Sequence, residues 1–458
     1  MCYREFNIVI VSIMKPNSNG YSLPFVLLIS TLLAIFFLYL FQILLYQDFD
    51  QKKKISKKKL DYACYSAIQK ILAKRDISEF KLEQIEVNDI KVILSNFHYG
   101  FYDKLFAEAH NTFDSSLLEC TIAEIPSSTF DNAMIFSKPN LRATVAGNTI
   151  IKGNILATTD NFTFGHIYGI SKTNKNFLTG KIIVKNEIES KAFNDSIITD
   201  YLFQSNVNDF DLIINADWEL DNSVLDNIDP GYKILVSGNL FISGKLSAPN
   251  TFKQLFIKSS GKTLIAENTI SNLELSVSSD SSIIVDNNSI LENCILISKS
   301  DITIKHKTQL KNVQLFSEGN ISLENVNAIY PSIAGIYVDL SDSSNMNNKI
   351  LITDSNFNGT ILLIPSLVGF SANHSRITID KKSNIQGLVY CENDLEFLGK
   401  LDGTIYTYKM YYYKEPTEYR NWLVELNVNR ENLDENFLIP ISFNDSKNYE
   451  ILREKWIH

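Results

Sequence analysis

The first strong pattern along the chain is an unbroken apolar stretch near its beginning. From Leu23 to Tyr46 almost every residue is apolar, and no charged residue occurs between Pro16 and Gln47. As a helix, this stretch would span about 36 Å, more than the roughly 30 Å thickness of a hydrocarbon core. A helix inside a soluble protein rarely runs this far without a charge. The pattern therefore predicts a retained transmembrane helix over residues 21–46.

The spacing of apolar residues changes after this stretch. Six lysines come first, and apolar residues then recur three or four positions apart, as on one face of a helix that packs against a core. We therefore predict a juxtamembrane helix over residues 47–78. Residues 79–129 show no sustained period, so they form a linking region with no assigned structure. The lysines are Lys52, Lys53, Lys54, Lys57, Lys58 and Lys59, and the apolar face is Leu60, Ala63, Ala67, Ile68, Ile71 and Leu72.

A repeated pattern with a short, nearly constant period occupies the middle of the chain. The segments 270–275, 291–296 and 310–315 align with one another. Each segment is followed by a second pair of alternating aliphatic residues, and these pairs recur in equal steps along the chain. One unit of this length cannot bury its own apolar side chains, but a stack of units can. Each unit is expected to hold two short strands. The second pairs are Ile283/Val285, Ile302/Ile304 and Ile321/Leu323.

This repeat predicts a parallel β-helix over residues 130–410. Leu275, Leu296 and Leu315 are expected to stack in one interior column, and the Asn ahead of each first strand is expected at a corner, where Asn tolerates left-handed backbone. A β-sandwich is the main alternative, since many short strands also fit that fold. Further turns of less regular length are indicated by a recurring pair, a glycine with an aliphatic residue two positions later, at Gly153/Ile155, Gly180/Ile182, Gly244/Leu246, Gly359/Ile361, Gly387/Val389 and Gly403/Ile405.

The stretch from 411 to 458 departs from the repeat, and its first part is rich in aromatic residues. A solenoid needs a cover over its last turn, because an open end exposes both apolar core and strand edges. We therefore predict a C-terminal cap over 411–458. The alternative is a platform that binds carbohydrate or a partner protein, since exposed aromatic rings are good stacking surfaces. The aromatic residues here and just before are Tyr406, Tyr408, Tyr411, Tyr412, Tyr413, Tyr419 and Trp422.

Composition narrows the function classes. The chain has 458 residues, with 52 acidic against 43 basic residues and a net charge of −9. This acidic balance argues against nucleic-acid binding, which usually requires a concentrated basic face. The five cysteines form no CxxC pair, so no disulfide framework or zinc site is indicated. Cys294 and Cys391 are expected to be small buried apolar residues.

Candidate chemistry is sparse in the sequence. Six aspartates cluster between 209 and 229, but their spacing does not match a calcium-binding EF-hand loop. We interpret them as solvated loop residues, with weak Ca²⁺ binding as the alternative. The six histidines are dispersed, and no nucleophile or phosphate-binding motif is present. We therefore predict no catalytic residue, metal ligand or cofactor, and a non-enzymatic protein. The aspartates are Asp209, Asp211, Asp217, Asp221, Asp226 and Asp229.

The segment before the apolar stretch, residues 1–20, resembles a known processing signal. If Met14 is the start, a short polar leader ends at Gly20, and Tyr21 opens the apolar segment. This region resembles the type IV prepilin cleavage region, in which a dedicated peptidase cuts after the glycine and leaves the helix as the anchor. The resemblance implies cleavage between Gly20 and Tyr21. Most pilins have Glu where Phe25 stands here, so the chain is closer to the minor pilin and minor pseudopilin branches.

A second resemblance concerns the body of the chain. Residues 147–153 read Gly-Asn-Thr-Ile-Ile-Lys-Gly, and the segments 330–332 and 386–391 read Tyr-Pro-Ser and Gln-Gly-Leu-Val-Tyr-Cys. These segments resemble a group of uncharacterised Bacteroidetes-type membrane proteins in which a prepilin-like anchor precedes a β-helix. The repeat as a whole resembles polymer-forming β-helix proteins. Neither resemblance implies an enzymatic activity.

Together these features predict a membrane-anchored structural or assembly protein of the cell envelope. We expect a prepilin-like component of a pilus or secretion apparatus, single-pass in the inner membrane with its bulk outside. Its expected partners are the lipid bilayer and other pilin-like or envelope assembly proteins, with no nucleic acid. One alternative is an anchored carbohydrate-binding or carbohydrate-active β-helix. Another is a cytoplasmic, bactofilin-like tethered polymer, which the lysines after the apolar stretch favour under the positive-inside rule.

Overall fold

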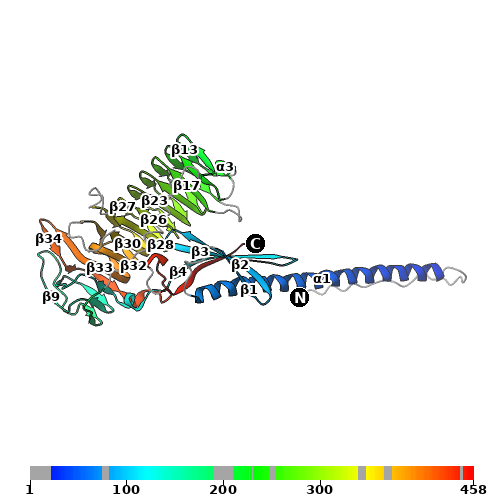
Figure 1. The fold of residues 1–458 in the computed structure, drawn as a ribbon, viewed down its shortest axis with the longest axis horizontal. Helices are drawn as coiled ribbons and strands as arrows, with labels where there is room; N and C mark the ends of the chain where they lie inside the picture. The colour runs from blue at the N-terminus through cyan, green and yellow to red at the C-terminus, as the bar shows by residue number, and fades with distance from the viewer. Residues whose placement is uncertain are drawn as a thin grey trace, which may run out of the picture.

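The computed structural model describes residues 22–74, 82–188, 210–225, 227–228, 231–247, 254–338, 347–365, 374–443 and 447–457. It shows three parts, which are a long helix, a small antiparallel sheet and a large parallel β solenoid (Figure 1). The predicted fold class is confirmed: the chain is mainly β, with one apolar helix near its N-terminus and a parallel solenoid after it. The predicted cleavage pair, Gly20 and Tyr21, lies outside the described residues.

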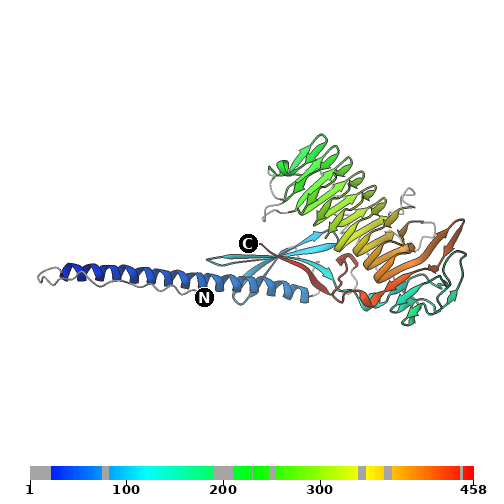
Figure 2. The same ribbon diagram turned by 180° about the vertical axis from the view of Figure 1, so that it is seen from behind.

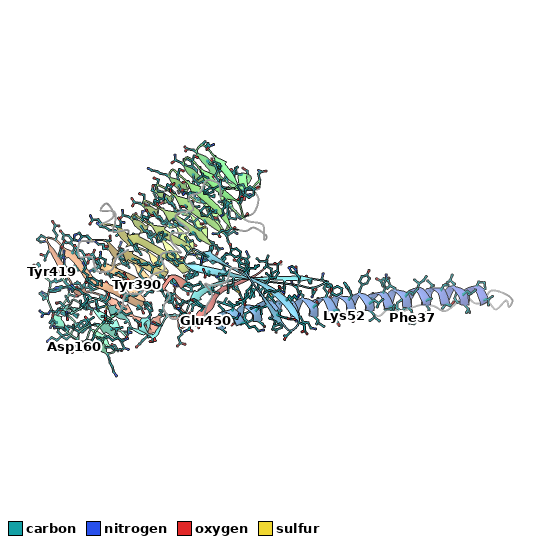
Figure 3. All side chains as sticks on the ribbon, viewed as in Figure 1. Phe37, Lys52, Asp160, Tyr390, Tyr419 and Glu450 are labelled. Atoms are coloured by element: carbon teal, nitrogen blue, oxygen red, sulfur yellow. The ribbon has the colours of Figure 1, made fainter. Side chains whose placement is uncertain are left out.

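Helix α1 (Ser22–Ala73) joins the two predicted helices into one. Its apolar first half is exposed, from Leu23 at 71% to Tyr46 at 69%, and projects away from the rest of the molecule (Figures 1 and 3). Its second half is buried from Leu60 onward, along the face that the apolar spacing predicted. One helix therefore has a bare half and a packed half.

The segment 79–129, which the sequence left unassigned, forms most of an antiparallel sheet. Its strands are β1 (Leu82–Val87), β2 (Ile90–Tyr99), β3 (Tyr102–His110) and β4 (Ser115–Glu124), and the last strand of the chain, β37 (Tyr449–Ile457), pairs with β4. The buried face of α1 packs on this sheet through Leu60, Ala67, Ile68, Val92, Leu105 and Leu118. We call α1 residues 60–73 and these five strands the head.

The solenoid has three strands in its regular turns, where the sequence predicted two. One turn consists of β17 (Leu255–Ser259), β18 (Thr263–Ile265) and β19 (Ile270–Ser271), and the next of β20 (Leu275–Ser279), β21 (Ile283–Val285) and β22 (Ile290–Glu292). Each strand pairs in parallel with its equivalent in the following turn. The third strand is too short to show an alternation of its own, so the sequence pattern merged it with the strand that follows.

The remaining solenoid elements follow the same scheme. They are β5 (Met134–Phe136), β6 (Ala143–Ala146), β7 (Ile150–Lys152), β8 (Ile155–Ala157), β9 (Phe162–Phe164), β10 (Leu178–Thr179), β11 (Ile182–Val184), β12 (Leu212–Ile214), β13 (Trp218–Leu220), α3 (Asn222–Leu225), β14 (Lys233–Val236), β15 (Leu240–Ile242), β16 (Lys245–Leu246), β23 (Cys294–Ser298), β24 (Ile302–Ile304), β25 (Gln309–Lys311), β26 (Gln314–Ser317), β27 (Ile321–Glu324), β28 (Asn327–Val338), β29 (Lys349–Thr353), β30 (Asn356–Pro365), β31 (Arg376–Ile379), β32 (Asn384–Phe397), β33 (Lys400–Lys414), β34 (Thr417–Arg420), β35 (Trp422–Val424) and β36 (Asn427–Asn429). Short 3₁₀ helices occur at Ser128–Asp131, Arg430–Asn432 and Ile441–Phe443.

The predicted interior column is correct in its second half and wrong in its first. Leu296 pairs with Leu315 as expected, but Leu275 pairs with Cys294, and Val277 lies in the column with Leu296. The alignment of the sequence segments matched Leu275 with Leu296, two residues beyond its true partner Cys294. Since alternate residues face inward, a shift of two keeps apolar side chains inside and leaves the local pattern unchanged.

Corners use the left-handed backbone that the sequence predicted. Asn293 and Asn312 have φ of 57° and 53°, whereas Asn272, the third predicted corner, is not among the residues with positive φ. Glycines stack where turns approach most closely. Gly387 has φ of 132°, and a Cβ on it would lie 2.0 Å from the carbonyl oxygen of Gly359. Only glycine fits such a position, because any side chain would collide with backbone.

The turns do not stack in the order of the sequence. Strand β33 pairs with β36 and with β5, and these in turn pair with β7 and β8. The turns of residues 134–184 therefore extend the stack beyond residue 410, and Figures 1 and 2 show the teal strands around β9 beside the orange strands β33 and β34. The C-terminal segment 411–458 was predicted to cover an end of the solenoid. Its strand β36 lies inside the stack, between β33 and β7.

Candidate functional site

The head is fixed to one outer face of the solenoid. The β2–β3 turn contacts Gln314, whose Oε1 accepts a hydrogen bond from the N–H of Phe101 at 2.7 Å and whose Nε2 donates to the carbonyl of Tyr99 at 3.0 Å. Gly100 sits between them with φ of 62°, and a Cβ there would lie 2.2 Å from Gln314 Oε1. A side chain at position 100 would therefore have to displace the Gln314 amide from its two hydrogen bonds with the turn, at a φ that glycine adopts most readily.

A buried charge reinforces this junction. Lys104 Nζ lies 2.7 Å from Glu119 in the head and 2.6 Å from Glu274 in the solenoid, and the lysine side chain is 8% exposed. The ammonium group also lies 4.2 Å from the centre of the Tyr99 ring. Breaking a buried ion pair leaves an uncompensated charge, which is strongly destabilising. The head and the solenoid are therefore held firmly to each other at this point.

The outer face of β31, β32 and β33 carries a column of charged side chains. Pairing places Lys349 beside Arg376, Arg376 beside Asp394, and Asp394 beside Lys409. Lys138 follows β5, the strand that continues the stack past β33. We call Lys349, Arg376, Lys409 and Lys138, together with Asp394, the basic column. Its members come from successive turns, which lie about 4.8 Å apart.

The charges within the basic column are not balanced. Asp394 pairs with Lys409 at 3.1 Å, and both side chains are largely buried, at 12% and 15% exposed. Burial lowers the pKa of Lys138, and the nearby cations Lys409 and Arg420 lower it further, while Asp394 opposes them. The column itself holds four cations against the one carboxylate of Asp394, so positive charge is in excess along it.

An aromatic hairpin borders the basic column. The end of β33 and strand β34 form it, with Tyr411 opposite Arg420 and Tyr413 opposite Glu418. We call residues 411–420 the tyrosine hairpin. The guanidinium carbon of Arg376 lies 4.5 Å from the centre of the Tyr411 ring, so the column and the hairpin share one face. Tyr413 is 49% exposed, and its N–H donates to Glu396 at 3.3 Å.

A buried carboxyl lies at the corner next to this face. Glu392 is 5% exposed, and it accepts a hydrogen bond from the hydroxyl of Tyr390. The Tyr390 ring stacks on Tyr406 with centroids 4.3 Å apart, and Phe443 meets it edge-on at 5.1 Å. Burial raises the pKa of Glu392 to about 7, and the hydrogen bond from Tyr390 opposes the rise. Such a group stays protonated inside the fold at mildly acidic pH.

A recess of about 390 Å³ lies at the edge of the head. Tyr65, Gln69 and Leu72 of α1 form one wall, and residues 449–454 of β37 form the other. Its charged side chains, Glu450 among them, are exposed, and Figure 3 places Glu450 beside the helix. The recess is therefore an open surface feature between helix and strand, separate from the basic column.

The described aspartates of the acidic segment accept hydrogen bonds from backbone N–H groups. Asp211 accepts from the N–H of Lys233, Asp217 from the N–H of Asn239, and Asp221 from the N–H of Val224. Asp209, Asp226 and Asp229 lie outside the described residues. Among described residues no three His, Cys, Asp or Glu side chains gather as a metal site would require. The structure therefore brings these carboxylates to separate backbone positions.

The cysteines are buried and free wherever the structure describes them. This confirms the prediction for Cys294 and Cys391, and it holds also for Cys64 and Cys120. Burial raises the pKa of the Cys294 and Cys391 thiols to about 12. At neutral pH these groups are protonated and serve as small apolar residues.

Sequence reasoning missed the basic column because its members are distant in the chain. Lys138 and Lys349 are separated by most of the solenoid, and only the stacking order joins them. The tyrosines of the hairpin were noticed, but nothing in the sequence placed Arg376 over Tyr411. No family model matches the sequence, and no curated protein matches it.

Proposed function

We propose that this chain is a membrane-anchored structural or assembly protein, a prepilin-like component of a cell-envelope pilus or secretion apparatus. In this proposal the first half of α1 lies in the inner membrane, and the head and solenoid lie outside it. One observation carries the proposal: the same helix is bare and apolar from Leu23 to Tyr46, and packed on the head from Leu60 onward. A helix of this kind is long and apolar enough to cross a membrane.

The energetic argument concerns the bare half of α1. Within Leu23–Tyr46 most of the large apolar side chains are exposed, among them Phe25, Phe37 and Leu38 at 59%, 62% and 68%. Burying one such side chain is worth about 1.5–3 kcal/mol, so leaving all of them in water would cost on the order of tens of kcal/mol. Lipid, or lipid together with neighbouring helices, is the cover that this proposal assigns.

The connection between anchor and solenoid supports a role in assembly. The helix continues without a break from its bare half into the head, and the head is held to the solenoid by Gln314 and by the buried Lys104. A continuous helix transmits position, whereas a Gly/Ser-rich tether would not. The solenoid is therefore presented at a fixed orientation to the anchor, as a component of a larger assembly requires.

The lysines after the bare half favour the opposite orientation under the positive-inside rule. Two of them pair with aspartates one helical turn earlier, Lys52 with Asp48 and Lys54 with Asp50, each at 2.7 Å. A third, Lys57, donates to the carbonyl of Ser115 in the head. Half of the six lysines thus have partners within the protein, which supports a structural role for this stretch.

The test is protease accessibility of a C-terminal tag in intact spheroplasts, with intact-mass determination of the extracted protein. The proposal expects the tag to be degraded and the mass to lack every residue through Gly20. The control variant Gly20→Leu should keep the leader while the tag stays accessible, because the helix still inserts. A protected tag with an uncut leader would overturn the proposal, and the cytoplasmic bactofilin-like polymer would replace it.

A further inference from the structure

We propose that the basic column and the tyrosine hairpin form a binding surface for an acidic polysaccharide. The chain as a whole carries a net charge of −9, yet the column and the hairpin bring five cations, Arg420 included, to one face against the three carboxylates Asp394, Glu396 and Glu418. Arg420 pairs with Glu418 at 3.4 Å, and the excess positive charge lies along the column. A local excess of cations on an acidic protein attracts an anionic ligand. Burial is the main cause of the lowered pKa of Lys138, and repulsion from Lys409 and Arg420 adds to it, so a bound anion would relieve part of the cost of charging this lysine.

The layout of the cations specifies a linear ligand. Lys349, Arg376, Lys409 and Lys138 come from turns stacked along the solenoid, so they follow its axis at steps of about 4.8 Å or a multiple of it. Strands hold the backbones of Lys349, Arg376 and Lys409, and Lys138 lies two residues after the end of β5. An extended polymer lying along the axis would meet Lys349 and Arg376, then pass the ion pair of Asp394 with Lys409, and then reach Lys138.

The tyrosine hairpin adds the features that a sugar requires. Tyr413 is 49% exposed beside Glu418 and Glu396. An aromatic ring stacks on the apolar face of a sugar ring, and carboxylates accept hydrogen bonds from its hydroxyl groups. Arg376, which lies over Tyr411, can donate to a carboxylate of the polymer through its guanidinium N–H groups.

Two other polyanions fit this face less well. A nucleic acid carries about one charge per 1.7 Å of duplex, and Asp394, Glu396 and Glu418 would repel so dense a charge. Anionic lipid headgroups are out of reach if α1 is the anchor, because β33 and β34 lie at the end of the molecule opposite the free end of that helix (Figure 1). Carboxylated sugars offer sparse charges separated by hydroxyl groups, which suits the mixed charges of the column.

The test is binding of the full-length protein in detergent to polygalacturonate, with dextran as the neutral polymer and oligo(dT) as the dense polyanion. We expect polygalacturonate to bind in a salt-dependent manner, dextran not to bind, and oligo(dT) to bind more weakly. Arg376→Gln should weaken polygalacturonate binding about tenfold or more, and Tyr413→Ala about three- to tenfold. Lys349→Gln, at an exposed position, should leave folding undisturbed and weaken binding about threefold.

The matched control is Phe241→Ala, which removes an aromatic ring that is 39% exposed on β15, far along the solenoid. This variant should bind polygalacturonate like the parent protein. Equal weakening by Phe241→Ala, tighter binding of oligo(dT), or no binding of polygalacturonate would each overturn the assignment. The purified protein is used, so the result does not depend on orientation in the membrane, and failure of the anchoring proposal would be seen separately by proteolysis.

Discussion

Replacing Glu392 with glutamine should stabilise the protein at alkaline pH and leave its stability almost unchanged at acidic pH. The carboxyl is 5% exposed, and its hydrogen bond from Tyr390 would be kept by the glutamine carbonyl. Burial raises the pKa of Glu392 from its ordinary value of 4.5 to about 7. The folded protein therefore holds this proton in a pH range where the unfolded chain has already released it.

The magnitude follows from linkage between proton binding and folding. A raised pKa of an acid means that stability is fully present below pH 4.5 and is lost as the pH rises to about 7. At about 1.36 kcal/mol for each unit between the two pKa values, the loss is about 3 kcal/mol. Glutamine does not ionise, so the Glu392→Gln variant escapes this loss.

The assay is guanidinium unfolding of the full chain in mild detergent, followed by tryptophan fluorescence at about pH 4, below the unfolded-chain pKa, and at about pH 8.5. The variant should exceed the parent by about 3 kcal/mol at the higher pH and match it within about 0.5 kcal/mol at the lower. Glu435→Gln, at an exposed position of the same C-terminal half, is the control and should show no such pH dependence. Equal stability of Glu392→Gln and parent at both pH values would refute the reasoning.

Three further predictions concern folding. Lys104→Ala should lower the free energy of unfolding by about 3–5 kcal/mol, since it leaves the buried carboxylate of Glu119 and the partly buried carboxylate of Glu274 without their cation. Lys104→Ala combined with glutamine at both carboxylates should recover part of this loss in the same denaturation assay. Gly387→Ala should lower the free energy of unfolding by at least about 2 kcal/mol, because its Cβ would meet backbone. Gly244→Ala has nothing within 4 Å of its Cβ and should lower it by only about 1 kcal/mol, for its φ of 77°. Similar losses for the two variants would contradict the packing argument. Cys294 should resist a thiol reagent at about pH 8 until the protein is unfolded, because burial raises the pKa of its thiol to about 12. The labelled cysteine is located by peptide mass, and rapid labelling of Cys294 in the native protein would contradict a closed interior.

The period of the repeat predicted the solenoid, but local patterns could not determine its register or its order. Two alignments of the segment 270–275 place an apolar residue inward, and only the pairing of Val277 with Leu296 distinguishes them. A strand as short as β19 (Ile270–Ser271) cannot show a period. The head strands alternate weakly because α1 covers one face and the solenoid covers part of the other.

The candidate surface was even less accessible to sequence reasoning. The aromatic residues near 411–422 were visible, and a carbohydrate or partner platform was considered for them. The cations that accompany them were not, because Lys138, Lys349 and Arg376 become neighbours only through stacking between distant segments. Long-range contacts of this kind leave no local signal in a single sequence.

The stacking order has a consequence for folding during synthesis on the ribosome. Strands β5, β7 and β8 are made early, but β33 and β36, with which they pair, emerge only after most of the solenoid has been synthesised. At about 5–20 residues per second, those strand edges wait roughly 12–50 s for their neighbours. During this interval they are templates for any other extended chain. The yield of folded protein would therefore depend on export machinery or a holdase that shields residues 134–184. A truncation just before Trp422 would remove a turn from the interior of the stack rather than from its end.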